Sequence, residues 1–350
     1  MRIRHLSAFF SMLTLVMGTL PLSAEPFTGI VAFGDSLSDA GNVFVATGGT
    51  IPAPPYVGGH FSNGPTWVER LSQNLGLGVL RPSLAGGTDF AFGSAVTGNS
   101  VPGVTSLVPN ITQQVGLFLS TTGGVAAPSN LYTMWIGSDD VYQAVTDVAS
   151  NLFPIAVIQN AIGAAAQSET AAVNALATAG ATTFIIPLLP DLGKTPLGTP
   201  AAALATSLSA LYNTDLVTDL TALAVADHIT VGLIDTFALI DSAVSNPPAF
   251  GLTNATEPCY TGPLTGRPPA PCATPATYQF WDTQHPTETG HDLIARVAQN
   301  VAVPEPPTLP IFVAAAFVAL ICRRGRKFAA ARPRGIPPFL SPTRLRRRLG

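Results

Sequence analysis

Short, fully apolar runs alternate along the chain with longer stretches in which apolar residues recur at helical spacing. The short runs lack the alternation of a strand with one exposed face, so they predict strands buried on both faces, as in a parallel sheet. Four such strands are predicted, at residues 30–33, 131–136, 181–190 and 229–235.

The stretches between these runs predict helices. Pro65 or Thr66 suits the start of the first helix, and Pro154 divides the long apolar stretch 141–180 into two helices. The order of strand, helix and strand at this spacing predicts a parallel sheet with right-handed crossovers. The other predicted helices cover residues 66–75, 112–120, 201–227 and 286–300.

The two ends of the chain have the patterns of targeting segments. Residues 1–24 combine two arginines, an apolar run and Pro-Leu-Ser-Ala, which predicts a secretory signal peptide cleaved after Ala24. The apolar run is too short for a membrane span, which needs about 20 apolar residues. We therefore expect an exported protein, in the periplasm, on the outer surface or outside the cell, whose main domain covers residues 25–302.

The C-terminal end carries Val-Pro-Glu-Pro-Pro at 303–307, an apolar run at 308–322 and a basic cluster that ends at Lys327. The basic cluster would stop translocation and leave the apolar run in the inner membrane before processing. This order at 303–327 resembles a PEP-CTERM sorting signal, which implies recognition by the export and sorting machinery of Gram-negative bacteria. Such signals end soon after the arginines, whereas a Pro- and Arg-rich tail, predicted to be disordered, follows here at 328–350.

The charge is distributed very unevenly. Hydrophobic residues make up 47% of the chain and charged residues only 11%, so there is ample material for a core. Residues 25–303 contain five Lys and Arg against 19 Asp and Glu, whereas ten of the 17 basic residues lie in 323–348. An acidic body repels nucleic acid, so we expect no nucleic-acid partner.

Two of the three cysteines form a candidate disulfide. Cys259 and Cys272 flank a loop rich in Pro, Gly and Thr, and in an exported protein such a pair predicts a disulfide, the alternative being two free thiols. No second Cys or His pair has the spacing of metal ligands, so we expect no metal site. Cys322 stands apart in the C-terminal apolar run.

The candidate chemistry begins where the first predicted strand ends. Ser36 follows that strand in Gly-Asp-Ser-Leu-Ser-Asp-Ala-Gly-Asn, residues 34–42, and open α/β sheets place reactive groups at the carboxyl ends of their strands. Serine needs a base to become a nucleophile. Asp282 stands three residues before His285, so it can accept from Nδ1–H and leave Nε2 facing Ser36. The alternative is a structural turn with capping side chains.

Residues 34–42 and Trp-Asp-Thr-Gln-His-Pro-Thr at 281–287 resemble the first and last motifs of the GDSL esterase/lipase family, also called SGNH hydrolases. The resemblance implies a flavodoxin-like three-layer α/β/α sandwich with about five parallel strands, and ester hydrolysis through an acyl-enzyme without metal or cofactor. It implies that Ser36 attacks, that His285 acts as base and then acid, and that Asp282 orients His285. Residues 86–95 resemble the second motif, which assigns the Gly93 amide, together with the Ser36 amide, to the oxyanion.

The third motif of the family, Gly-x-Asn-Asp, is altered at residues 137–140, where Asp139 replaces the asparagine that donates to the oxyanion. An ionised carboxylate cannot donate and repels negative charge. Loss of one oxyanion donor typically costs about 10²–10³ in rate. Asp139 can therefore serve only when it is protonated, which requires a desolvated site.

Three functions are consistent with these residues. The first is an esterase or lipase that hydrolyses lipid or short-acyl esters, with a small-molecule ester as its substrate. In the second, the same machinery acts on carbohydrate or aryl esters. In the third, Asp139 marks an impaired site and the protein is a surface binding module.

Overall fold

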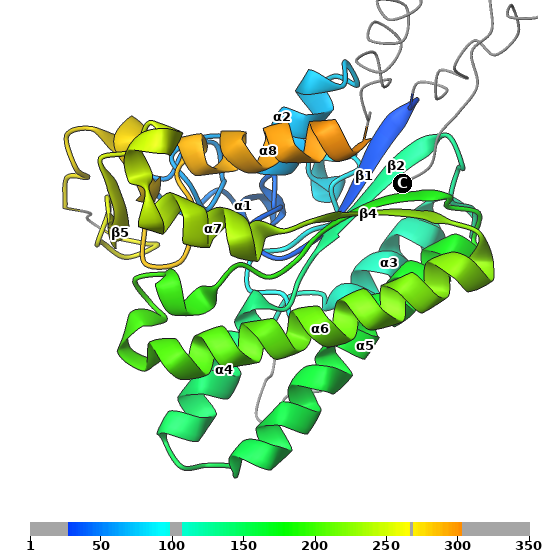
Figure 1. Ribbon diagram of the computed structural model, residues 1–350. Coiled ribbons are helices and arrows are strands. Elements are labelled where there is room, and N and C mark those ends of the chain that lie inside the picture. Colours follow the sequence, from blue (N-terminus) through cyan, green and yellow to red (C-terminus); the bar gives the residue numbers. More distant parts are fainter. Residues whose placement is uncertain (1–26, 99–106, 267–268, 303–350) are drawn as a thin grey trace, which may run out of the picture. The chain divides into compact units, whose positions relative to one another are not determined.

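The computed structural model describes residues 27–98, 107–266 and 269–302 (Figure 1). The predicted signal peptide, sorting segment and basic tail lie outside the described residues, so their assignments stay predictions. Within the described ranges, no helix is both long and apolar enough to cross a membrane. The candidate membrane segment 308–322 is not among them.

The centre of the fold is a four-stranded parallel sheet in the order β1-β2-β3-β4. Each strand coincides with one of the four apolar runs. A fifth segment, residues 88–92, lies along the other edge of β1, where Phe90 N–H donates to the Ala32 carbonyl at 2.7 Å and Phe92 N–H to the Gly34 carbonyl at 3.1 Å. The sheet thus has four strands, and this segment takes the edge position where the expected fifth strand would lie. The strands are β1 (Gly29–Gly34), β2 (Asn130–Trp135), β3 (Thr183–Pro187) and β4 (Thr230–Ile234).

Helices cover both faces of this sheet, as Figure 1 shows. Alternate residues of β1 point to opposite faces: Val31 and Phe33 pack against one helical layer, and Ile30 and Ala32 against the other. This arrangement confirms the three-layer α/β/α sandwich. The first layer contains α3 (Ile111–Thr121), α4 (Ser138–Ala149), α5 (Ile155–Thr178) and α6 (Ala202–Asp227), and the second contains α2 (Trp67–Asn74) and α8 (Glu288–Ala302).

The helix starts follow from local chemistry. Thr66 N–H donates to the Glu69 carboxylate at 2.8 Å in a capping box that begins α2. Pro154 directly precedes α5 and separates it from α4, as predicted. The pattern did not predict the shorter elements, which are α1 (Asn42–Ala46), α7 (Thr236–Ser245), β5 (Asn254–Pro258), β6 (Tyr278–Phe280) and the 3₁₀ turns Ser83–Ala85, Leu192–Lys194, Thr199–Ala201, Pro247–Phe250 and Pro275–Thr277.

Two histidines outside the active-site motif join structural elements. His291 is a buried polar residue of α8, and its Nδ1 accepts from Trp67 N–H at 3.2 Å. Burial lowers the pKa of His291 to about 3, so it stays neutral at physiological pH. His60 forms an ion pair with Glu69, with 3.0 Å between Nε2 and a carboxylate oxygen.

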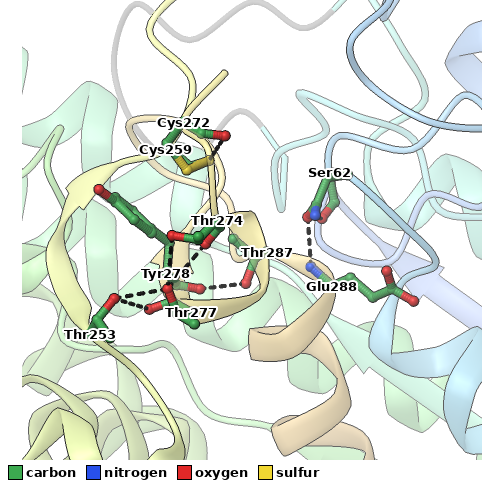
Figure 2. The surroundings of a disulfide bond; sticks show 10 residues. Ser62, Thr253, Cys259, Cys272, Thr274, Thr277, Tyr278, Thr287 and Glu288 are labelled. Carbon is green, nitrogen blue, oxygen red and sulfur yellow. Dashed lines mark hydrogen bonds between the residues drawn. A yellow bond between two sulfur atoms is a disulfide. The ribbon is translucent and has the colours of Figure 1, made fainter. Parts of the chain in front are cut away.

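A second, two-stranded sheet of β5 and β6 carries the predicted disulfide between Cys259 and Cys272 (Figure 2). Cys259 N–H donates to the Phe280 carbonyl at 3.1 Å, and Cys272 N–H donates to the Cys259 carbonyl at 2.7 Å. The disulfide therefore closes a loop directly onto the strand β6 that leads into Asp282 and His285.

Replacing both bridged cysteines by serine should lower the free energy of unfolding by about 2–4 kcal/mol, because the unfolded chain regains the freedom of the closed loop. Urea denaturation of the oxidised wild-type protein and the double variant Cys259→Ser/Cys272→Ser measures this difference. Wild-type protein unfolded under reducing conditions should give the midpoint of the variant. Coinciding midpoints of oxidised wild type and variant would contradict the prediction.

Candidate active site

Ser36 lies in a turn at the end of β1 that is otherwise buried. It is partly accessible, whereas both of its neighbours in the chain are buried. Gly34 has a φ of +147°, and a Cβ there would lie 2.2 Å from the Trp135 carbonyl oxygen, so this strand end requires glycine. Gln114 clamps it: Gly34 N–H donates to Gln114 Oε1 at 2.9 Å, and Gln114 Nε2 donates to the Gly34 carbonyl at 2.8 Å. The main chain under Ser36 is thereby held on both sides.

The structure brings Ser36, His285 and Asp282 together, although 249 positions separate Ser36 from His285. His285 Nε2 lies 2.8 Å from Ser36 Oγ, and His285 Nδ1 lies 2.7 Å from Asp282 Oδ2. Asp282 Oδ1 accepts from the N–H groups of Gln284 at 2.9 Å and His285 at 2.8 Å. Burial alone would raise the pKa of Asp282, but the charge and hydrogen bond of His285 and these amides bring it below its ordinary value.

One hydrogen bond within the loop that carries His285 and contacts from two other segments hold this loop. Trp281 N–H donates to the His285 carbonyl at 2.8 Å, and Ser62 Oγ donates to the Pro286 carbonyl at 2.8 Å. Leu197 N–H donates to the carbonyl of Thr283 at 2.7 Å. The imidazole is buried, and its ring centre lies 5.5 Å from that of Phe61. A base held in this way presents Nε2 to Ser36 without further rearrangement.

Gly93 does not present the free amide that the second motif implies. Its N–H donates to Asp39 Oδ2 at 2.8 Å and is therefore occupied inside the protein. The position still requires glycine, because a Cβ would lie 2.3 Å from the Phe61 ring. In this structure Gly93 supports the shape of the site, and an oxyanion would need other donors.

Asp39 joins the serine segment to the segment that contains Gly93. Besides Gly93, its carboxylate accepts from the N–H groups of Gly41 at 2.7 Å, Asn42 and Val43. Burial raises the pKa of Asp39 to about 6, while the four amides act in the opposite direction. Motif resemblance singled out Ser36 and missed this anchor. The signal that could have found it is the spacing of Asp39 from Asn42, which is typical of side chains that cap a turn or helix start.

Asn42 and Asp89 add a second connection between the same two segments. Asn42 Nδ2 donates to the carbonyl groups of Asp89 at 2.8 Å and Ala91 at 2.9 Å. The Asp89 carboxylate in turn accepts from Ala40 N–H at 2.7 Å. The polar residues of the serine motif therefore position the nucleophile.

Asp139 lies in the first turn of α4 and lines the same pocket as Ser36 and His285. No residue in the described ranges donates a hydrogen bond to its carboxyl group. Burial raises the pKa of Asp139 to about 6, and the charge of His285 acts in the opposite direction. Asp139 itself is partly exposed to the pocket, and its surroundings favour the protonated form in mildly acidic conditions.

The pocket beside Ser36 is mostly apolar. It opens at the carboxyl ends of β1, β2 and β3 and reaches α7 and α8. Such a lining favours an uncharged, apolar substrate group next to the nucleophile. The apolar side chains are Leu37, Trp135, Leu192, Ile240, Phe280 and Ile294.

Further carboxyl groups are buried behind the pocket. Burial raises the pKa values of Asp35, Asp140 and Glu169, to about 7 for Asp140. Asp140 is paired, since Thr97 N–H and Oγ1 each donate to it at 2.9 Å. The described part of the chain contains no group of three or more side chains suited to hold a metal ion.

A serine, a histidine and an aspartate connected in this order at the carboxyl ends of a parallel sheet are the arrangement of a serine hydrolase. The sequence matches the model of the GDSL-like lipase/acylhydrolase family over residues 30–298, and the chain belongs to this family. By class it is a carboxylic ester hydrolase. The resemblance drawn from the first and last motifs is thereby confirmed.

Two relatives illustrate the range of the family. The chain is 30% identical over 251 residues to phosphatidylcholine-sterol acyltransferase of Aeromonas hydrophila, covering 70% of this chain and 69% of the relative. It is 29% identical over 326 residues to esterase EstA of Pseudomonas aeruginosa, covering 80% of this chain but only 47% of the relative, so it spans about half of that protein.

Among solved structures, phospholipase A1 from Streptomyces albidoflavus NA297 aligns with a TM-score of 0.38 and 15% identity, over 79% of this chain and 99% of that chain. This likeness is too weak to add to the family match.

Replacing Asp39 by alanine should lower the free energy of unfolding by about 3 kcal/mol or more, because several buried N–H groups each lose their acceptor at roughly 1–3 kcal/mol. It should also lower esterase activity by displacing Ser36. Chemical denaturation and ester hydrolysis of the same preparations measure both effects. Asp227→Ala on the exposed end of α6 is the control and should stay within about 0.5 kcal/mol of wild type. Equal stability of the two variants would contradict the anchoring role of Asp39.

Proposed function

We propose that this protein is a serine esterase that hydrolyses carboxylic esters through an acyl-enzyme on Ser36. The observation that carries the proposal is the chain of hydrogen bonds from Ser36 Oγ through His285 to Asp282, at 2.8 and 2.7 Å, next to an apolar pocket. A binding module has no need of a serine connected to a buried imidazole and carboxylate in this way.

In the proposed reaction, His285 Nε2 takes the proton of Ser36 as Oγ attacks the ester carbonyl. The tetrahedral intermediate collapses when the imidazolium gives this proton to the leaving alkoxide, and the acyl group stays on Ser36. His285 then takes a proton from water as the water attacks the acyl-enzyme. The imidazolium returns this proton to Ser36 Oγ when the second tetrahedral intermediate collapses and the carboxylic acid leaves. Asp282 stays ionised throughout, stabilises the imidazolium and fixes its orientation.

Two groups are proposed to stabilise the oxyanion. No acceptor among the described residues takes the hydrogen bond of the Ser36 N–H, which leaves this amide available. The second donor is the protonated carboxyl group of Asp139, which lines the pocket beside Ser36. Because its pKa lies at about 6, this donor is present in acid and is lost as the pH rises.

The lining of the pocket supports one substrate class. Leu37, Ile240 and Phe280 offer an acyl group apolar contacts, and the exposed lining is mostly apolar, with Thr195 and Gln284 among its few polar side chains away from the triad. We therefore favour simple lipid or short-acyl esters over carbohydrate esters. The segments at 1–24 and 303–327 support export and sorting to the cell envelope, with passing membrane attachment through 308–322.

Residues 25–302 should hydrolyse p-nitrophenyl butyrate, and Ser36→Ala should lower kcat by at least about 10³-fold, because the variant loses the hydroxyl group that is hydrogen-bonded to His285. A fluorophosphonate probe should label the wild-type protein on Ser36, as mass spectrometry of the labelled peptide can show. Lack of both turnover and labelling, across acyl chains of two to twelve carbons, would overturn the proposed function.

Asp139→Asn should raise kcat at pH 8 by about tenfold or more, because the amide donates at every pH whereas the carboxylate repels the oxyanion. Below about pH 6, where the wild-type carboxyl group is protonated, the advantage of the variant should shrink toward unity. The measurement is the ratio of kcat values of the two proteins between pH 5 and 8.5. A ratio that does not change with pH would show that Asp139 takes no part in oxyanion binding.

A further inference from the structure

A residue outside the sequence motifs touches the catalytic carboxylate. Tyr56 Oη donates to Asp282 Oδ2 at 2.7 Å, and this oxygen also receives the hydrogen bond of His285 Nδ1. With the two amides on Oδ1, Asp282 has four hydrogen-bond partners. Both oxygens of this carboxylate are therefore held in fixed directions.

The phenol of Tyr56 acts here only as a donor. Its side chain is buried, with 6% of the residue exposed. Burial and the neighbouring Asp282 charge raise its pKa far above the ordinary value, so the proton stays on Oη across the working range of pH. A neutral donor on a carboxylate stabilises the ionised form of that carboxylate.

An aromatic cluster fixes the position of Tyr56. Its ring meets those of Tyr260 and Trp281 edge-on, with ring centres 5.4 and 6.0 Å away. Tyr260 and Trp281 are themselves stacked at 5.5 Å, and Tyr260 N–H donates to the Trp281 carbonyl at 2.6 Å. Trp281 directly precedes Asp282. The end of β6 therefore supplies both a ring that packs against Tyr56 and the carboxylate that accepts its hydrogen bond.

The disulfide loop anchors the main chain before Tyr56. Ala53 N–H donates to the carbonyl of Leu264, which lies within the loop closed by Cys259 and Cys272, at 2.8 Å. Tyr56 N–H donates in turn to the Ala53 carbonyl at 3.2 Å. Figure 2 shows how the same region is tied to the start of α8, where Thr287 Oγ1 donates to the Tyr278 carbonyl at 2.6 Å.

We propose that Tyr56 is a positioning residue of the esterase, which holds the Asp282 carboxylate in the orientation that His285 requires. The inference rests on the proposed function. Without the phenol, Oδ2 would lose its second donor, the carboxylate could rotate, and its charge on the imidazole side would increase. Tyr56 thus sets both the geometry of the His285–Asp282 pair and the pH range in which the base is active.

The test is Tyr56→Phe, which keeps the ring and removes only the hydroxyl group. We expect kcat for p-nitrophenyl butyrate to fall about tenfold, equivalent to roughly 1.4 kcal/mol of transition-state stabilisation, with KM nearly unchanged. The more concentrated charge on Asp282 favours the imidazolium, so the acid limb of the kcat/KM profile should move to higher pH, by roughly half a unit.

Tyr260→Phe is the matched control. It removes a hydroxyl group from the same aromatic cluster, where Tyr260 Oη donates to the Pro263 carbonyl at 2.9 Å and does not reach Asp282. This variant should keep the wild-type kcat and pH profile, and thermal unfolding of both variants checks that they are folded. Equal activity losses in the two variants, or an acid limb that stays in place in Tyr56→Phe, would overturn the proposal.

A spectroscopic measurement separates this proposal from the esterase function itself. The low-field proton resonance of His285 Nδ1–H reports on the His285–Asp282 hydrogen bond without any substrate. It should shift in Tyr56→Phe and stay in place in Tyr260→Phe. If the wild-type protein hydrolyses no ester, the proposed function fails, and this resonance still decides whether Tyr56 holds Asp282: an unchanged position in Tyr56→Phe would exclude it.

Discussion

Buried carboxylates that accept hydrogen bonds from main-chain amides hold this active site together. Asp39 joins the turn after Ser36 to the segment of Gly93, and Asp282 receives two amides beside His285. Buried acids are usually paired with lysine or arginine, but residues 25–303 contain only five of these. Main-chain N–H groups take the place of lysine and arginine as partners. The fold fixes the direction of an N–H group, whereas a long basic side chain can move. The cost of burial appears in the raised pKa values of Asp39 and Asp89.

The catalytic groups come from two separately built parts of the molecule. The four-stranded sheet carries Ser36, whereas the loop after the disulfide-bearing pair of strands carries Asp282 and His285. Each part has its own core, and the smaller core consists of aromatic residues around the disulfide. Contacts such as that of Ser62 with Pro286 join the two parts close to the site. The hydrogen bond between Ser36 and His285 therefore depends on packing at a distance from both residues.

The main elements of the fold and the three residues of the candidate triad could be predicted from the sequence. Short apolar runs bounded by turn residues favour buried strands, and long helices show their period over many residues, so these elements could be predicted. The short strands β5 and β6 have no such period and depend on the disulfide and on each other. Tyr56 could not be predicted, because its role arises from a contact with a residue 226 positions away. The occupation of the Gly93 amide by Asp39 is likewise a tertiary contact that a motif does not encode.

At Asp139 the site differs chemically from the usual form of this motif. In the usual form of this motif an amide supplies a permanent donor, whereas here burial must keep a proton on a carboxyl group. The charge of an ionised Asp139 in turn raises the pKa values of the buried carboxyl groups of Asp35 and Asp140, because each ionised neighbour disfavours a second negative charge.

The distance in sequence between Ser36 and His285 also determines when activity can appear during synthesis and folding. The nucleophile follows the first strand, and its base precedes the last described helix, so an unfinished chain contains a serine without the imidazole that would activate it. Ester hydrolysis by this triad can begin only when the loop that carries His285, directly before α8, has folded against the end of β1. The protein therefore has no esterase activity while the chain is still being synthesised. The appearance of this activity marks the stage at which Ser36 and His285 have come together.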